Sequence, residues 1–170
     1  MEKVLLTGSD GFIPSHVADE LIKRGYEVIP FDIYSNLEQD IRNQKMIEAY
    51  MANADYVIHC AANPYIPFGY SHPNEFFETN ATGTLHILNA ARKTGTRVVY
   101  TSTSEVYGTS EDPNLPMHED HRIRPQSTYA VAKYAGAGLC TTYPHEHKGD
   151  LTTVRNSEEP TSELPSPMYL

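Results

Sequence analysis

The chain has 170 residues, of which 39% are hydrophobic and 21% charged, so we expect one compact domain with a real core and exclude wholesale disorder. Lys and Arg number 13 against 22 Asp and Glu, and the formal net charge of -9 argues against binding to the phosphate backbone of nucleic acids. No apolar run is long enough to cross a membrane and the first residues lack the plan of a signal peptide, so we expect a cytoplasmic protein that binds neither nucleic acid nor membrane.

Short apolar runs alternate with longer helical patterns along the chain, and this rhythm predicts βαβ units around a parallel sheet. The expected strands, in chain order, span residues 3–7, 27–31, 55–61, 97–102 and 151–155. The expected helices span about residues 12–24, a stretch that ends at Met51, and about residues 74–93 and 127–143. We therefore predict an α/β fold, a Rossmann-type doubly wound parallel sheet with helices on both faces.

Three local features refine this plan. In the first helix, Val17, Leu21 and Ile22 are predicted to share the apolar face. Pro144 is expected to end or kink the last helix, because proline removes a helical hydrogen bond. Cys60 and Cys140 cannot make a disulfide scaffold, and both are expected to be reduced and buried.

The composition changes after Asn156. Residues 157–170 contain three prolines and three glutamates, without lysine, arginine or periodicity. This stretch is predicted to be a disordered or non-native tail, and its run Ser-Glu-Glu-Pro-Thr-Ser-Glu-Leu-Pro-Ser resembles the translation of a common sequencing adapter. Residues 1–156 are then expected to form the folded domain of a truncated chain.

A turn with two glycines, Thr7-Gly8-Ser9-Asp10-Gly11-Phe12-Ile13, joins the first strand to the first helix. A helix start offers unpaired N–H groups and the positive end of its dipole, which together suit a pyrophosphate. Gly8 permits the tight turn, and Gly11 lets the backbone approach the phosphates without a side chain in the way. Asp32 ends the second strand, where a carboxylate can accept hydrogen bonds from a ribose and repel a 2′-phosphate. The pattern predicts a dinucleotide site that prefers NAD to NADP; the alternative is an ordinary glycine turn with a solvated aspartate.

Pro14 stands where dinucleotide-binding turns usually place a third small residue. Its missing N–H matters little in the first helical turn, where that donor has no helical partner. Its ring is bulky, however, so we expect a slightly displaced helix start and weaker cofactor binding.

Tyr129 and Lys133 lie four residues apart on the predicted last helix, so one helix face carries both side chains. An ammonium near a phenol favours the phenolate and lowers the pKa of the tyrosine toward neutrality. Such a phenol can remove a proton from a sugar hydroxyl. A surface pair on an amphipathic helix has the same spacing, but the position after the fourth strand favours the catalytic interpretation.

Hydroxyl and carboxyl side chains follow the fourth strand in the run Thr101-Ser102-Thr103-Ser104-Glu105-Val106-Tyr107-Gly108. Open parallel sheets bind their ligands beyond the carboxyl ends of the strands. Hydroxyls there can bind a substrate hydroxyl or a developing oxyanion, and Glu105 is a candidate second proton carrier. The alternative is a serine-threonine turn with a solvated glutamate.

Five motifs occur in the order and spacing of the extended short-chain dehydrogenases/reductases. They are Thr7 to Ile13, Val57 to Ala62, Asn80 to Thr84, Ser102 to Gly108 and Tyr129 to Lys133. Over about residues 3–156 the chain resembles the branch of NAD-dependent nucleotide-sugar epimerases, dehydratases and decarboxylases. In that family a tyrosine base takes a proton from a sugar hydroxyl while hydride passes to the nicotinamide of bound NAD. The family's second half, which grips the nucleotide diphosphate, is missing, so the resemblance implies an incomplete NAD-binding domain that is inactive by itself.

The resemblance implies a role for each matching residue. Tyr129 matches the base, Lys133 the residue that lowers its pKa and binds the nicotinamide ribose, and Thr103 the hydroxyl that completes the triad. Asp32 matches the ribose acceptor, and Asp40 and Ile41 resemble the pair that flanks adenine. The implied cofactor-binding residues are Gly8, Gly11, Phe12, Ile13, Asp32, Asp40, Ile41, Ala61, Ala62, Asn80, Thr101, Tyr129 and Lys133.

The sequence indicates the type of reaction less clearly than it indicates the cofactor. The family's dehydratases usually place Asp-Glu after the threonine, whereas this chain has Ser104-Glu105. That pair resembles several 4-epimerases and some decarboxylases, so a 4-epimerase acting on a nucleotide-diphosphate sugar is preferred, with a decarboxylase or a 4,6-dehydratase as alternatives. From another class, a non-catalytic NAD-binding sensor or interaction domain stays open, because a fold does not fix a function.

Two further expectations concern partners and metals. The helices near residues 74–93 and 127–143 resemble the pair through which the family commonly forms homodimers. The histidine-containing runs 118–121 and 145–147 have no further ligand support, so no metal site is expected.

Overall fold

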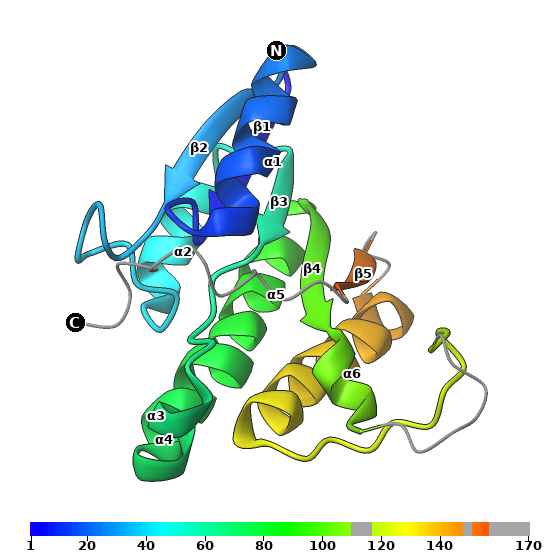
Figure 1. Ribbon diagram of the computed structural model, residues 1–170. Coiled ribbons are helices and arrows are strands. Elements are labelled where there is room, and N and C mark those ends of the chain that lie inside the picture. Colours follow the sequence, from blue (N-terminus) through cyan, green and yellow to red (C-terminus); the bar gives the residue numbers. More distant parts are fainter. Residues whose placement is uncertain (110–116, 148–150, 157–170) are drawn as a thin grey trace.

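The computed structural model describes residues 1–109, 117–147 and 151–156, and its elements alternate as the sequence predicts (Figure 1). The strands are β1 (Lys3–Thr7), β2 (Glu27–Phe31), β3 (Tyr56–His59), β4 (Arg97–Thr103) and β5 (Leu151–Asn156). The longer helices are α1 (Phe12–Lys23), α2 (Gln44–Met51), α5 (Gly83–Thr94) and α6 (Thr128–His147). The shorter ones are α3 (Ile66–Ser71), α4 (Pro73–Phe77), the π-helical turn η1 (Glu78–Thr82) and the 3-10 turn η2 (Ser104–Tyr107). The predicted tail, 157–170, lies outside the described residues.

The five strands form one parallel sheet in the order β2-β1-β3-β4-β5. β1 lies between β2 and β3, with Leu5 level with Ile29 of β2 and Val57 of β3. The chain passes from β1 to β2 on one side of β1, and the later strands β3, β4 and β5 follow one another on its other side. The carboxyl ends of β1 and β3 are therefore the switch point at which such sheets bind their ligands. The predicted Rossmann-type α/β fold is confirmed.

Different helices cover the two faces of the sheet (Figure 1). α1 contacts β1 and β2 on one face, whereas α5 and α6 contact β4 on the other face and α2 packs against α5. Because side chains alternate along a strand, Leu5 points into the core under α2 and α5, while Val4 and Leu6 point to the face that carries α1. All three side chains are buried.

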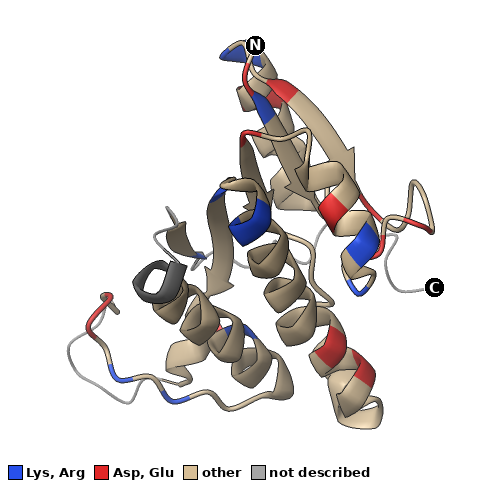
Figure 2. Cartoon of the chain, turned by 180° about the vertical axis from the view of Figure 1, so that it is seen from behind, with Lys and Arg blue, Asp and Glu red and all other residues tan. Residues whose placement is uncertain are grey.

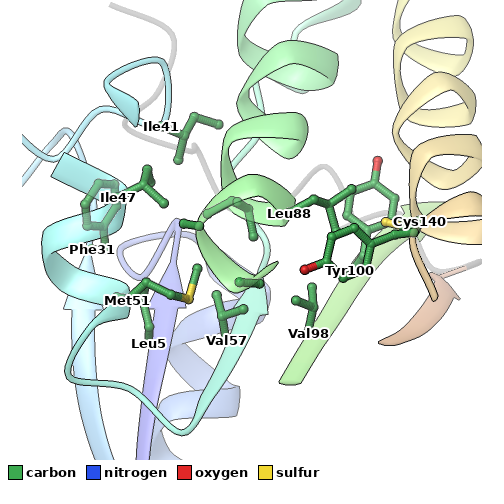
Figure 3. Packing of buried hydrophobic residues seen from close by; sticks show 14 of the residues in the cluster. Leu5, Phe31, Ile41, Ile47, Met51, Val57, Leu88, Val98, Tyr100 and Cys140 are labelled. Carbon is green, nitrogen blue, oxygen red and sulfur yellow. The ribbon is translucent and has the colours of Figure 1, made fainter. Parts of the chain in front are cut away.

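The main hydrophobic core lies between the sheet and helices α2, α5 and α6 (Figure 3). Leu5, Val57 and Val98 come from three neighbouring strands at one register level, and Ile47 and Leu88 reach them from α2 and α5. Removing apolar surface from water contributes about 25 cal/mol per Å², so this cluster is the main source of stability. It fixes the helices relative to the carboxyl ends of the strands.

The helical stretch before β4 is more divided than the sequence predicts. It begins with α3, in a segment expected to be a loop, and passes through α4 and η1 before α5. The wide π-helical turn brings the buried side chain of Asn80 against the backbone of Asn63, which donates to it at 2.7 Å and accepts from it at 2.9 Å. Apolar spacing does not reveal such a turn, because the hydrogen bonds that hold it involve a loop distant in sequence.

Three smaller expectations are wrong. Ile22 is 61% exposed, because α1 faces the sheet with buried Pro14 and with the half-buried side chains of Val17 and Leu21. α6 continues through position 144 to His147, so it does not end there, since the hydrogen bond that proline loses lies in the last turns of a helix already held by its earlier residues. A kink at this position stays a prediction. Cys60 is half-buried, because β3 ends before it, whereas Cys140 is buried in the core as expected; both are free thiols.

Candidate functional site

The carboxyl ends of the strands line one edge of the sheet, and most of the predicted site residues lie there. Because the strands are parallel and adjacent, residues that end or follow them are neighbours in space. The residues at this edge are Gly8, Asp32, Ala61, Ala62, Thr101 and Thr103. The structure thus brings together positions that are far apart in sequence, and their individual roles stay predictions.

The turn after β1 presses directly on the chain that leaves β3. Gly8 has a φ of +74°, in the left-handed region, and its N–H donates to the carbonyl of Phe31 at 2.8 Å. A Cβ on Gly8 would lie 2.8 Å from both Cα and N of Ala61, closer than a side chain can come to a backbone. Glycine is therefore required here both by the backbone conformation and by the close approach of the chain that leaves β3.

The start of α1 is open to a ligand. Gly11 precedes the helix in an extended conformation and no side chain caps the first turn, which contains Phe12 and Ile13. The N–H groups of a first helical turn have no helical acceptor, so they can bind the oxygens of a pyrophosphate. Pro14 is buried, and Ser15 N still donates to Gly11 O at 3.0 Å. The helix begins at the predicted residue, Phe12, while the displaced helix start and the weaker cofactor binding expected from Pro14 stay predictions.

Asp32 is tied to the glycine turn by its carboxylate. It is 7% exposed, and its two oxygens accept from Asp10 N at 3.0 Å and from Tyr34 N at 2.9 Å. The Asp10 carboxylate in turn accepts from the hydroxyl of Ser35, so a second acid lies beside the expected ribose acceptor. Sequence reasoning missed this contribution of Asp10, although its place in the turn was visible. Two neighbouring carboxylates disfavour a further phosphate on that ribose.

The expected adenine pair, Asp40 and Ile41, follows β2 through a loop. Burial raises the pKa of Asp40, but the hydrogen bonds and charge of Arg42, 2.6 Å away, outweigh it and hold the pKa below its usual range. Ile41 is 5% exposed and fits against Gly83, where a Cβ would lie 2.7 Å from its Cδ1. His86 Nδ1 donates to Ile41 O at 3.0 Å. α5 therefore fixes the residue expected to pack against the base.

A buried polar network connects the end of β1 to α5. His59 Nδ1 lies 2.8 Å from Thr7 Oγ1, and its Nε2 lies 3.1 Å from Thr84 Oγ1, which donates to Asn80 O at 3.0 Å. Burial, with the charge of Lys133 as a second cause, lowers the pKa of His59 to about 3, so its ring is neutral. Sequence reasoning placed His59 in a strand and assigned it no role. Because its ring is hydrogen-bonded on both sides, His59 fixes the distance between the end of β1 and the start of α5.

Tyr129 and Lys133 lie one turn apart near the start of α6, which packs against β4, η1 and η2. The half-buried ring of Tyr129 contacts Phe76 edge-on, with 6.3 Å between centroids. Lys133 is 3% exposed, and burial lowers its pKa to about 8. Its charge acts on the His59 ring and on the Cys60 thiol, so the helix residue reaches the same strand end that Gly8 contacts.

The residues after β4 are held in fixed positions. Thr103 caps η2, with its hydroxyl accepting from Glu105 N at 3.2 Å, and the carboxylate side chain of Glu105 is half-buried. The Thr101 hydroxyl donates to His59 O at 2.9 Å. Hydroxyls ordered in this way beside α6 can orient a substrate hydroxyl toward a base.

The described residues contain neither a metal cluster nor a membrane-spanning helix. Over 1–109, 117–147 and 151–156, no three His, Cys, Asp or Glu side chains form a group that could hold an ion. His118 and His121 pack against each other with 4.2 Å between ring centroids, and the side chains of 145–147 lie outside the description. None of the described helices has the length and apolar character needed to cross a bilayer.

The chain belongs to the NAD dependent epimerase/dehydratase family, whose model matches residues 4–158. It is 29% identical to UDP-glucuronic acid decarboxylase 1 of Danio rerio over 172 residues, which cover 91% of this chain and 40% of that protein. It is 30% identical to dTDP-glucose 4,6-dehydratase of Streptomyces antibioticus, over 91% of this chain and 52% of the relative.

A solved structure has the same fold over nearly the whole chain. UDP-glucose 4-epimerase from Brucella ovis in complex with NAD superimposes with a TM-score of 0.85 and 26% identity, covering 93% of this chain and 52% of that protein. The predicted family and its NAD dependence are thereby confirmed. The chain spans about half the length of these relatives or less.

Proposed function

We propose that residues 1–156 are the NAD-binding half of a nucleotide-sugar enzyme that acts by transient oxidation of a sugar hydroxyl, with 4-epimerisation as the preferred outcome. The chain by itself is proposed to bind NAD without completing turnover, because relatives of this family are about twice as long. The observation that carries the proposal is the meeting of two features at the carboxyl end of β3. The glycine turn contacts Ala61, which follows β3, and Lys133 Nζ lies 4.5 Å from the ring of Tyr100, which is level with His59 at the end of β3.

The cofactor residues fit NAD in their chemistry. The uncapped start of α1, with Gly8, Gly11 and the N–H groups of Phe12 and Ile13, is suited to the pyrophosphate. Asp32 is suited to the adenosine ribose. The remaining proposed contacts, to adenine and along the cleft, come from Asp40, Ile41, Ala61, Ala62, Asn80 and Thr101. Bound NAD supplies the acceptor and, later, the donor of hydride.

The proposed proton transfer belongs to Tyr129. The Lys133 ammonium, one helical turn away, favours the phenolate by its charge and is suited to bind the nicotinamide ribose. Thr103 orients the substrate hydroxyl, and Glu105 at the start of η2 is proposed as a second proton carrier. Tyr129 removes the proton of a sugar hydroxyl while the carbon that carries this hydroxyl loses a hydride. The product is a keto-sugar.

The fate of the keto-sugar depends on residues after Thr103. Ser104 stands where a dehydratase of this family usually has aspartate, so the acid for eliminating water is missing and epimerisation is preferred. Decarboxylation is the second candidate, because the chain is 29% identical to a UDP-glucuronic acid decarboxylase over 91% of its length. Both outcomes share the first oxidation, so the proposed roles of Tyr129, Lys133 and Thr103 apply to either.

Assembly into a homodimer through α5 and α6 is also proposed. Figure 2 shows these two helices with few charged residues along their middle turns. Leu85 of α5 is 38% exposed, and Val131 and Tyr134 of α6 are 45% and 44% exposed. Apolar side chains exposed on adjacent helices favour association with a second copy.

The test has two arms. Calorimetry with the 170-residue chain is expected to show NAD binding, and failure to bind NAD would refute the proposal. In a protein that continues residues 1–156 to the length of the relatives, Tyr129→Phe is expected to abolish turnover of UDP-glucose or UDP-glucuronate while NAD binding is retained. Retained biological activity of that variant would instead support a non-catalytic NAD sensor.

A further inference from the structure

The ammonium of Lys133 is buried without a carboxylate partner. Its residue is 3% exposed, and across the described residues none of the ion pairs involves it. Burial of a charge is costly unless another group offsets it, and burial lowers the pKa of Lys133 to about 8. The proposed catalysis needs this amine positively charged near neutral pH, so a neighbouring group that favours the cation would support it.

The aromatic ring of Tyr100 lies directly beneath that ammonium. Lys133 Nζ is 4.5 Å from the ring centroid, within the distance at which the negative face of an aromatic ring attracts a cation. Tyr100 is fully buried on β4, packed between the core and α6 beside Cys140 (Figure 3). Because the ring is shielded from water, its attraction for the cation is stronger than at an exposed site.

The hydroxyl of the same tyrosine holds the backbone of Lys133. Tyr100 Oη donates to Lys133 O at 3.2 Å. Gly136, three residues further along α6, makes room for this contact, because a Cβ there would lie 2.5 Å from the hydroxyl oxygen. Glycine inside a helix costs about 1 kcal/mol relative to alanine, so its presence in α6 is consistent with the close approach of Tyr100.

We propose that Tyr100 is the positioning residue of Lys133: its ring holds the ammonium and its hydroxyl holds the main chain of the same residue. This inference rests on the proposed function, in which Lys133 acts on Tyr129 and on the nicotinamide ribose. Tyr100 acts through Lys133, so its effect is on the charge and placement of the amine.

The remaining groups around the ammonium bring no competing charge. His59 at the end of β3 and Cys60 directly after it lie within range of its charge, and Cys140 and Tyr129 belong to its own helix. His59 is neutral, and burial raises the pKa of both thiols, that of Cys140 to about 12. His59 and the two thiols therefore do not stabilise the cation at neutral pH, whereas the face of the Tyr100 ring does.

The test is the titration of Lys133 in the cofactor-free 170-residue chain. The chain contains six lysines, so ¹³C-labelled lysine gives few NMR signals, and the Lys133 signal is assigned by its loss in Lys133→Arg. Tyr100→Phe keeps the ring and removes the hydroxyl. A fluorinated phenylalanine at position 100 has a similar volume but little negative potential on its face, and Tyr100→Leu removes the ring altogether.

We expect the pKa of Lys133 to stay nearly constant in Tyr100→Phe, and to fall by about one unit with the fluorinated ring and with Tyr100→Leu. An unchanged or raised pKa with the fluorinated ring would overturn the proposal, since it would show that the ring acts by packing alone. The fluorinated variant decides the matter even where Tyr100→Leu fails to fold. Because the measurement needs neither NAD nor turnover, its result is separate from the outcome for the proposed function.

Discussion

Gly8 offers the sharpest test of the cofactor turn, because Gly95 provides a matched control. Both residues have a φ of +74°, but a Cβ on Gly95 would meet nothing within 4 Å, whereas on Gly8 it would lie 2.8 Å from the backbone of Ala61. Gly95→Ala should cost only the left-handed conformation, about 1–2 kcal/mol. Gly8→Ala should add overpacking of about 1–3 kcal/mol, for a total of roughly 2–5 kcal/mol.

Urea denaturation followed by circular dichroism measures both changes in the free energy of unfolding. Calorimetry with NAD then separates stability from binding: Gly95→Ala should retain the affinity of the parent chain, while Gly8→Ala should lose at least about tenfold, because the turn must move away from β3. Equal destabilisation by the two alanines would refute the close approach of the turn to Ala61.

Three further predictions use the charged and buried groups. Folding lowers the pKa of Lys133 from 10.5 to about 8, so below pH 8 the burial of its charge costs about 3 kcal/mol of stability. This cost disappears as the pH rises to 10.5. Lys133→Met should therefore stabilise the chain at about pH 7 and not at pH 10.5, as urea titrations at the two pH values would show. The pKa of His59 falls from 6.5 to about 3, so the chain should lose stability as the pH drops through this interval, and His59→Gln should flatten that part of the profile. Asp32→Asn should weaken NAD binding about tenfold while reducing the preference over NADP, measured by calorimetry with both dinucleotides; an unchanged ratio would contradict the role of its charge.

Local patterns were sufficient for most of the fold. The strands, the bounds of α1 and the last residues of α5 follow from apolar runs, helical spacing and glycines, and here the structure differs by only a few residues. Ile22 and position 144 were predicted wrongly for opposite reasons. The exposure of Ile22 depends on which face α1 turns to the sheet, and the continuation of α6 past position 144 depends on a helix already formed by its earlier residues.

The candidate site was predicted as a set of positions, but not as a set of interactions. Gly8 and Lys133 carry visible sequence signals. Nothing in the local sequence indicates that the Tyr100 ring lies under the Lys133 ammonium, or that His59 bridges two threonines from different elements. His59 contacts residues 52 and 25 positions away, and Tyr100 contacts Lys133 across 33 positions. Local sequence patterns do not extend over such separations.

The order of residues along this chain determined its α/β class and the place of its phosphate turn, because both depend on spacing within a dozen residues. Tertiary structure decided the electrostatics. Burial of Lys133 and the neutral state of His59 arise where β3, β4 and α6 meet, and the desolvation of a charge depends on all surrounding groups at once.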